Sequence, residues 1–321
     1  MIKVHCFVSC VCEVLKKEKD VDHRPYYFGV WDSDFTVTDQ YTLAYHSSRI
    51  DHSFFVEWYR QLYGIDIVKW YDETKTKTEN TKALLDLIAS KGESRHVMVM
   101  LDLSMLPERE NKFHQKPFPH YVMIEKTEND QEWLMLDPDF RWEGVLSKQA
   151  ILAAIGEPTV AGGYYFDAEF IHPPTAEAVT AYFHTCLKKT CNPFTDAIRS
   201  IVTYHVMNRS HDRLAHALKQ IPVLAIRKYA YEHAFAYLLE PIKQNQLLFD
   251  WWCEEIEKLV QGFTTVQYKA MKLSMTGSAA QLQTVMEWLD RQDQQELMIK
   301  QKLADLFDQW QSHQPKERIY S

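Results

Sequence analysis

One stretch, from Pro119 to Phe140, constrains the fold of this chain more than any other. It contains two apolar runs, Tyr121 to Ile124 and Trp133 to Leu136. Residues 127–131 between them are turn-formers, because their polar side chains hydrogen-bond readily to their own backbone. Two such runs joined by a short polar turn predict a β-hairpin.

Two polar residues mark the ends of this hairpin. His120 immediately precedes the first run and Asp137 immediately follows the second. Pro138 then ends the pairing, because proline has no N–H to donate. In an antiparallel pair the start of one strand lies beside the end of the other, so we expect His120 and Asp137 side by side. An aspartate in that position can hold an imidazole through one ring nitrogen and leave the other free to act as a base.

The beginning of the chain supplies a candidate nucleophile for such a base. Apolar residues at Phe7, Val8, Val11, Val14 and Leu15 follow helical spacing and predict a buried helix. Cys6 falls in the first turn of this helix, where unpaired N–H groups and the helix dipole favour a thiolate. Cys10 and Cys12 are expected to be packed core thiols. The same structural role is the alternative for Cys6.

Composition limits the other possibilities. The net charge of −8 on 321 residues argues against a nucleic-acid partner and suits a cationic substrate, although it is also ordinary. The six cysteines match no paired zinc pattern, and a chain of this length needs no disulfides, so we expect reduced thiols and a cytoplasmic location. No run is long enough for a membrane span, and His5 and Glu13 interrupt the only stretch that resembles a signal peptide.

The periodicity of the chain changes near residues 168–174. Before that point the pattern predicts strands and helices in alternation, and after it only helices. The predicted strands outside the hairpin are 26–30, 65–70, 95–103 and 164–166, and the predicted helices of this half are 53–63, 79–90 and 147–155. The predicted helices of the second half are 175–188, 194–207, 210–219, 222–240, 245–273 and 278–311.

A helix that begins with a cysteine, followed by strands that carry His and then Asp, resembles the arrangement of papain-like cysteine enzymes. The chemistry assigns Cys6 as the nucleophile, His120 as the general base and Asp137 as the group that orients the imidazole. The predicted fold class is therefore α+β. Residues 1–170 would form a papain-like catalytic domain, an N-terminal helix plus an antiparallel sheet, and residues 171–321 an all-α domain.

Short motifs carry a further resemblance. They are HCFVS at 5–9, Phe28-Gly29, VMVMLDLSMLP at 97–107, PHYVMIE at 119–125 and MLDPDF at 135–140. Over roughly residues 1–170 these motifs resemble the butirosin-biosynthesis protein H N-terminal family, which is itself similar to bacteriocin-processing cysteine peptidases. Over its whole length the chain resembles the aryl transferases of petrobactin siderophore biosynthesis.

The resemblance implies an activity. A 3,4-dihydroxybenzoyl group, held as a thioester on the phosphopantetheine of an aryl carrier protein, would pass to an amine of spermidine or a related polyamine. The family's nucleophile, base and orienting carboxylate fall on Cys6, His120 and Asp137. The chain itself would hold no cofactor, and its partners would be the carrier protein and the polyamine.

One departure from the papain-like pattern concerns the oxyanion hole. Papain-like peptidases take one donor from a glutamine shortly before the cysteine, and no glutamine lies among the first five residues here. The Cys6 N–H can supply one donor. The second donor is not identifiable from the sequence.

Two other functions fit parts of the sequence. The first is a cysteine peptidase or amidase with the same triad. The second is a non-enzymatic helical interaction protein, which the intact set of Cys, His and Asp argues against. The large helical half favours transfer over hydrolysis, because it offers a surface for a carrier protein.

A polyamine substrate needs handles for its charged ammonium groups, either carboxylates or an aromatic face. The turn Trp31-Asp32-Ser33-Asp34 offers both. Asp102, which closes an apolar strand, is a second candidate because an aspartate there needs a partner. The alternative for Asp32 and Asp34 is a turn hydrogen-bonded to its own backbone. The predicted substrate-binding residues are therefore Trp31, Asp32, Asp34 and Asp102.

Overall fold

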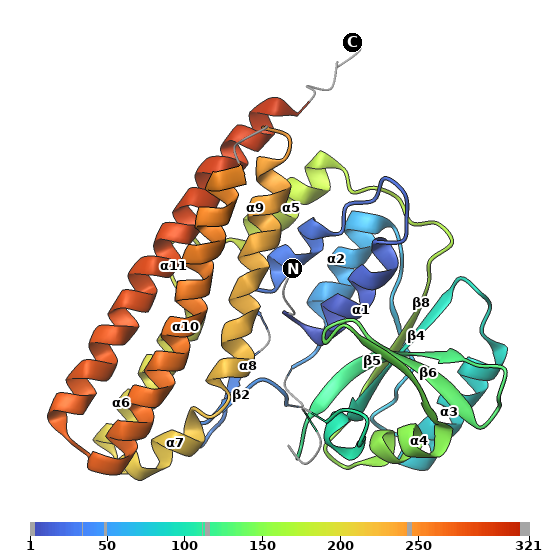
Figure 1. Ribbon diagram of the computed structural model, residues 1–321, viewed down its shortest axis with the longest axis horizontal. Helices are drawn as coiled ribbons and strands as arrows, with labels where there is room; N and C mark the ends of the chain where they lie inside the picture. Colours follow the sequence, from blue (N-terminus) through green and yellow to red (C-terminus); the bar gives the residue numbers. More distant parts are fainter. Residues whose placement is uncertain are drawn as a thin grey trace. The chain divides into compact units, whose positions relative to one another are not determined.

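The computed structural model describes residues 4–33, 35–47, 50–110, 112, 116–242 and 246–314. Contacts between Cα atoms divide the chain into two compact units. The sheet unit comprises His5–Tyr26 and Ser53–Pro174, and the helical unit comprises Met1–Val4, Tyr27–His52 and Thr175–Ser321. The chain is therefore mixed, with an antiparallel sheet in one unit and mostly helices in the other (Figure 1).

The sheet unit is built on a six-stranded antiparallel sheet with the order β3-β8-β4-β5-β6-β7. The strands are β3 Val68–Lys69, β4 Arg95–Asp102, β5 Pro119–Lys126, β6 Glu132–Asp137, β7 Trp142–Ser147 and β8 Gly163–Asp167. The predicted hairpin is confirmed as β5–β6, with Met123 paired to Leu136. It lies next to the buried strand β4, which the apolar run at 95–103 predicted.

Helices cover both faces of this sheet (Figure 1). Helices α3, Lys77–Ser90, and α4, Lys148–Gly156, bury one apolar layer together with alternate residues of β4, β5 and β6. Helices α1, Cys6–Leu15, and α2, Ser53–Tyr63, lie on the other face. There the Phe7 ring lies 5.8 Å from the Tyr121 ring, and the ring of Tyr59 lies 5.6 Å from that of Phe166. Successive strand residues point to opposite faces, so each strand serves both layers.

Local signals explain where these helices begin and end. Thr76 and Glu79 form a capping box at the start of α3, which satisfies two backbone N–H groups. Gly64 adopts a φ of 77° directly after α2, a conformation that glycine takes without steric penalty. The N-terminal helix, which the apolar spacing predicted, is confirmed as α1, and it begins at Cys6.

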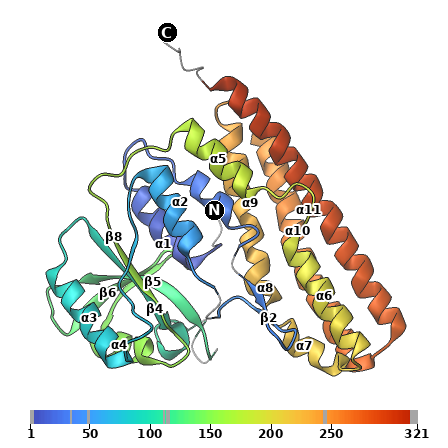
Figure 2. The same ribbon diagram turned by 180° about the vertical axis from the view of Figure 1, so that it is seen from behind.

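The helical unit packs around two long helices, α10, Gln246–Thr276, and α11, Ala279–His313 (Figure 2). Gly277, with a φ of 59°, lies in the short turn between them. Buried residues recur every three or four positions along α10, as in a helix that hides one face. The remaining helices of the unit are α5 Ala176–Cys186, α6 Pro193–Met207, α7 Leu214–Ala217, α8 Ile221–Ala225 and α9 Ala230–Leu239, with the short 3-10 helices η3 His211–Arg213 and η4 Ile226–Tyr229.

A segment from early in the sequence also belongs to the helical unit. Within Tyr27–His52, β1, Thr36–Val37, pairs with β2, Leu43–Ala44. Aromatic stacking holds the segment to the helices. The ring centroids of Tyr41 and Tyr204 are 3.7 Å apart, and those of Trp31 and Tyr231 are 4.8 Å apart. The N–H of Tyr45 donates to the Gln220 side chain at 2.8 Å.

Several predicted elements were wrong or incomplete. The predicted strand 26–30 is a 3-10 helix, η1, Arg24–Gly29. Asp22 accepts the N–H of Arg24 at 2.9 Å and Pro25 follows, which together start a helical turn. Only two residues of the predicted strand 65–70 pair, as β3. The predicted helices 210–219 and 222–240 are each broken into shorter helices, and strands β1, β2 and β7 were not predicted.

Candidate active site

The first helix presents Cys6 at its N-terminus. His5 precedes the helix in an extended conformation, and its Nδ1 accepts the N–H of Val8 at 3.5 Å. As the first residue of α1, Cys6 has an N–H without a carbonyl partner inside the helix. The Cys6 side chain is partly exposed, whereas Cys10 and Cys12 are fully buried, as core thiols should be. Burial raises the pKa of the Cys10 thiol well above its ordinary value.

The expected adjacency of His120 and Asp137 is confirmed. Nε2 of His120, on β5, lies 2.9 Å from Oδ1 of Asp137, on β6. The N–H of Phe140 also donates to that oxygen, at 3.2 Å. The His120 and Asp137 side chains are buried, so their hydrogen bond lies in a medium that screens it weakly.

The imidazole of His120 lies between the carboxylate and the thiol. Charge and hydrogen bonding from the Cys6 side chain both act to raise the pKa of His120. Because Nε2 bonds Asp137, Nδ1 is the ring nitrogen left for Cys6. Burial lowers the pKa of His120, but Asp137 and Cys6 outweigh it and hold the pKa well above its usual value. The arrangement therefore favours a protonated imidazole beside the ionised carboxylate of Asp137.

Arg109, which was not among the predicted site residues, also contacts Asp137. Its Nη2 donates to Oδ2 of Asp137 at 2.7 Å. The guanidinium lies 4.6 Å from the Trp142 ring centroid and is almost entirely buried. Burial raises the pKa of Asp137, yet His120 and Arg109 outweigh it and hold that pKa below its ordinary value. The only sequence signal was indirect: a buried aspartate needs more than one partner.

A second carboxylate of the same turn was also missed. Asp139 follows Asp137 by two residues and is buried. Its Oδ1 accepts the N–H of His5 at 3.2 Å and the hydroxyl of Ser9 at 2.8 Å. Burial raises the pKa of Asp139 above its ordinary value, against the opposing effect of His120. Both carboxylates of the sequence Asp-Pro-Asp therefore contact elements that carry the predicted triad.

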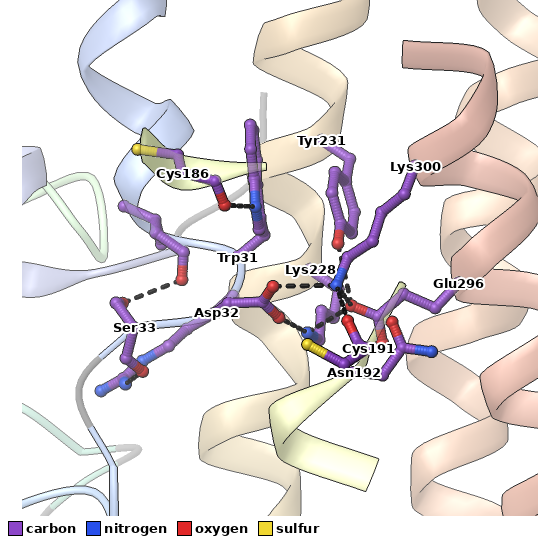
Figure 3. A network of polar contacts seen from close by, with 12 residues as sticks. Trp31, Asp32, Ser33, Cys186, Cys191, Asn192, Lys228, Tyr231, Glu296 and Lys300 are labelled. Atoms are coloured by element: carbon purple, nitrogen blue, oxygen red, sulfur yellow. Dashed lines mark hydrogen bonds and ion pairs between the residues drawn. The ribbon is translucent and has the colours of Figure 1, made fainter. Parts of the chain in front are cut away.

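The predicted amine-binding turn lies in the helical unit, where it joins a buried ion network (Figure 3). Oδ1 of Asp32 accepts from Lys228 at 2.8 Å, and Oδ2 accepts from Lys300 at 2.9 Å. Lys228 also donates to Glu296 at 2.6 Å. Burial opposes ionisation of Asp32, but the two lysines outweigh it and hold its pKa below the ordinary value.

The neighbours of Asp32 also have partners inside the protein. Trp31 stacks on Tyr231, and its indole N–H donates to the carbonyl of Cys186 at 3.2 Å. Asp34 lies outside the described residues. The turn-local alternative, a carboxylate bonded to its own backbone, is not the arrangement of Asp32, whose two oxygens accept from two distant lysines.

Asp102, at the end of β4, is fully buried and caps the turn that follows. Its Oδ1 accepts the N–H and hydroxyl of Ser104, at 3.0 and 2.6 Å, and the N–H of Phe118 at 2.9 Å. The aspartate thus has the partners that a buried strand end requires. The amine-binding role of Trp31, Asp32, Asp34 and Asp102 stays a prediction, and the described contacts give three of these residues a structural role.

The described part of the chain has a further polar hollow, but neither a metal cluster nor a membrane-spanning helix. No group of three or more His, Cys, Asp or Glu side chains there is arranged to hold a metal ion. A polar hollow of about 390 Å³ lies in the helical unit, against the β1–β2 hairpin. Its lining consists of Thr36, Thr38, Asp39, Gln40, Thr42, Ser47 and His216, none of which was predicted as a site residue. No described helix is both long enough and apolar enough to cross a membrane.

Comparison with known proteins places the chain in a family. Residues 1–171 match the DUF6005 N-terminal domain, and residues 177–320 match the DUF6005 C-terminal domain. The chain belongs to the DUF6005 family. This DUF6005 protein is 46% identical over 321 residues to a protein of Bacillus anthracis named "Petrobactin synthase". The match covers 99% of this chain and 98% of that protein.

Proposed function

We propose that this DUF6005 protein is a biosynthetic acyltransferase of petrobactin production. It would move a 3,4-dihydroxybenzoyl group from a carrier-protein thioester to an amine of spermidine or a related polyamine. The observation that carries the proposal is the contact of His120 with Asp137, with Nε2 2.9 Å from the carboxylate, together with the effect of Cys6, which also raises the pKa of His120. The near full-length similarity to a protein named petrobactin synthase supplies the pathway.

The first half-reaction would acylate Cys6. The thiolate attacks the thioester carbonyl, and the carbonyl oxygen becomes an oxyanion beside the free N–H at the start of α1. Collapse of this intermediate breaks the bond to the pantetheine sulfur. The imidazolium of His120 gives its proton to that sulfur, so a free thiol leaves and Cys6 holds the acyl group. Asp137 keeps the imidazole oriented throughout.

The second half-reaction would release the amide. A neutral amine nitrogen attacks the acyl-Cys6 carbonyl, and His120, now neutral, accepts the proton that this nitrogen loses. Collapse breaks the C–S bond and returns the Cys6 thiolate beside the His120 imidazolium. The sum is thioester plus amine giving amide plus thiol, with no oxidant, reductant or protein-bound cofactor required. The papain-like assignment of the sheet unit belongs to this proposal and rests on the order and contacts of the three residues.

Intact-mass spectrometry tests the covalent step. The protein is mixed with aryl-loaded carrier protein without amine, and we expect a mass increase of one dihydroxybenzoyl group that maps to Cys6. Cys6→Ala should show no adduct, and the matched variant Cys10→Ala should still form one. An adduct on Cys10, or none on wild type, would contradict the proposal.

Addition of polyamine to the isolated acyl-enzyme separates transfer from hydrolysis. We expect the product to be the polyamine with a dihydroxybenzoyl group on one nitrogen. Free dihydroxybenzoate as the main product would instead favour the amidase or peptidase alternative, which uses the same triad.

A further inference from the structure

A buried carboxylate that the proposed mechanism does not use lies beside the triad. The hydrogen bonds of Asp139 go to His5 and Ser9, and the residue is only 6% exposed. Its two hydrogen-bond donors, His5 and Ser9, precede it by 134 and 130 residues in the sequence. A buried carboxylate with long-range partners of this kind indicates a role in holding two elements together.

The donors of Asp139 flank the candidate nucleophile. His5 lies one residue before Cys6, and Ser9 lies three residues after it. On a helix, positions three apart share a face, so Asp139 binds the first turn of α1 on the side that carries Cys6. One oxygen of Asp139 accepts both bonds.

The other end of the connection is the turn after β6. The N–H of Phe140 donates to Asp137, and the N–H of Arg141 donates to the carbonyl of Pro138 at 3.2 Å. Asp137 and Asp139 are therefore held in one tight turn. Asp137 contacts the base and Asp139 contacts the helix of the nucleophile, so a single turn reaches both partners of the catalytic pair.

We propose that Asp139 is a positioning residue, which fixes the first turn of α1, and so the sulfur of Cys6, against the imidazole of His120. This inference rests on the proposed function for its importance, but the geometry it describes is independent of any acyl donor. Thiolate and imidazole must lie within hydrogen-bond reach, and a misplacement of about 1 Å can cost about 100-fold in rate. Ser9 shares the role as the hydroxyl donor.

The role depends on an accepting oxygen, so the two obvious substitutions should differ. Asp139→Ala removes the acceptor and should loosen the first turn of α1. Asp139→Asn keeps an oxygen that can accept from His5 and Ser9, and it should restore most of the lost function. Ser9→Ala removes one of the two hydrogen bonds, so its loss of function should be smaller than that of Asp139→Ala.

The rate of alkylation by iodoacetamide measures the reactivity of the Cys6 thiol in these variants, and it requires no substrate. The rate at Cys6 is followed by peptide mass spectrometry and divided by the rate at the exposed Cys191 in the same sample. We expect Asp139→Ala to lower this ratio by about tenfold or more, and Asp139→Asn to stay within about threefold of wild type. Asp72→Ala is a matched control, because Oδ1 of Asp72 also accepts an N–H and a hydroxyl, from Thr74, and this variant should leave the ratio unchanged.

Each outcome decides the proposal. An unchanged ratio in Asp139→Ala overturns it, and so does a loss in Asp139→Asn as large as that in Asp139→Ala, because charge rather than an acceptor would then matter. If Asp139→Ala does not fold, a lowered ratio in the folded Ser9→Ala variant supports the role, and an unchanged ratio rejects it. If the ratios behave as expected but carrier-bound acyl groups never reach Cys6, the proposed function fails while the positioning role stands.

Discussion

At the scale of residues, the proposed chemistry depends on the contacts of a single buried carboxylate, that of Asp137. Asp137 touches both His120 and Arg109, and its two oxygens are divided between them. Because burial alone would favour the protonated carboxyl, the two cationic neighbours keep Asp137 ionised.

Loss of the Asp137 carboxylate should therefore reduce turnover strongly. Asp137→Asn keeps the shape of the side chain but offers His120 an amide, which no longer stabilises an imidazolium. By analogy with the serine triad we expect turnover of the aryl donor to fall by about 10⁴-fold. Single-turnover acylation of Cys6 measures this directly, and a loss of less than tenfold would remove Asp137 from the mechanism.

Arg109 should set the acid limit of activity. The pKa of Asp137 is held below its ordinary value, so its favourable contacts exist above that value and are lost as pH falls through the folded pKa. Arg109→Ala removes one of the cations, and the acid limb of the pH profile of kcat/KM should move up by about one pH unit or more. Guanidinium added to the medium should restore part of the rate.

Arg95→Ala is the matched control for Arg109. Arg95 also pairs with an aspartate, Asp167, at 2.8 and 2.9 Å, and lies over the ring of Tyr165, but it does not touch the triad. Its substitution should leave the acid limb in place. An equal shift in both variants would mean that the effect is general destabilisation.

At the scale of elements, the buried ion network ties the early segment Tyr27–His52 to helix α11 of the helical unit. Asp32, Lys228 and Lys300 are nearly or fully buried, and every charge has an opposite partner (Figure 3). Removal of one partner leaves a buried charge without compensation.

Asp32→Ala should lower the free energy of unfolding by about 3–5 kcal/mol. Urea unfolding of the full chain, followed by tryptophan fluorescence, measures the loss, since Trp31 adjoins the network. Because the pKa of Asp32 is lowered in the folded state, its contribution is present at neutral pH and disappears as pH falls through the folded pKa. The difference between wild type and Asp32→Ala should therefore shrink in acid.

Substitution of Asp32 also distinguishes a role in stability from the predicted role in amine binding. Glu57→Ala, which removes a surface pair with Arg60, is the control and should not change unfolding measurably. If a stable Asp32→Asn variant raises KM for the polyamine while self-acylation of Cys6 is intact, the amine-binding prediction stands. An unchanged KM would assign Asp32 to stability alone.

At the scale of the whole molecule, the two units do not follow the order of the sequence. The change in periodicity predicted a domain boundary between residues 170 and 171, and the two DUF6005 domain matches meet at nearly the same place. Contacts nevertheless group Tyr27–His52 with the later helices. Phe28, for example, stacks with Tyr182 and contacts Phe183.

A fragment of residues 1–174 should therefore fold poorly. It would leave Phe28 and Trp31 without the aromatic residues that cover them, and Asp32 without both lysines. We expect the fragment to aggregate, and co-expression with residues 175–321 to restore solubility, as judged by gel filtration and circular dichroism. A soluble fragment with cooperative thermal unfolding would show that the segment needs no helical partner.

Elements whose signals are local could be predicted from the amino-acid sequence alone. Two apolar runs and the turn-formers between them predicted β5 and β6, and apolar spacing predicted α1, with Cys6 in its first turn. Antiparallel geometry then implied the contact between His120 and Asp137, because a short hairpin leaves only one arrangement of its strand ends. Capping and periodicity act over a few residues, so they can be read from the chain.

Contacts between groups that are distant in the sequence depend on how the elements pack. Arg109 reaches Asp137 from a loop, Asp139 meets Ser9 across 130 residues, and Asp32 meets Lys300 across 268. No local pattern encodes these pairs, because each depends on how elements pack after they form. Buried charges must find partners wherever the fold brings them, so the sequence predicts that such partners are needed and the packing selects which residues they are.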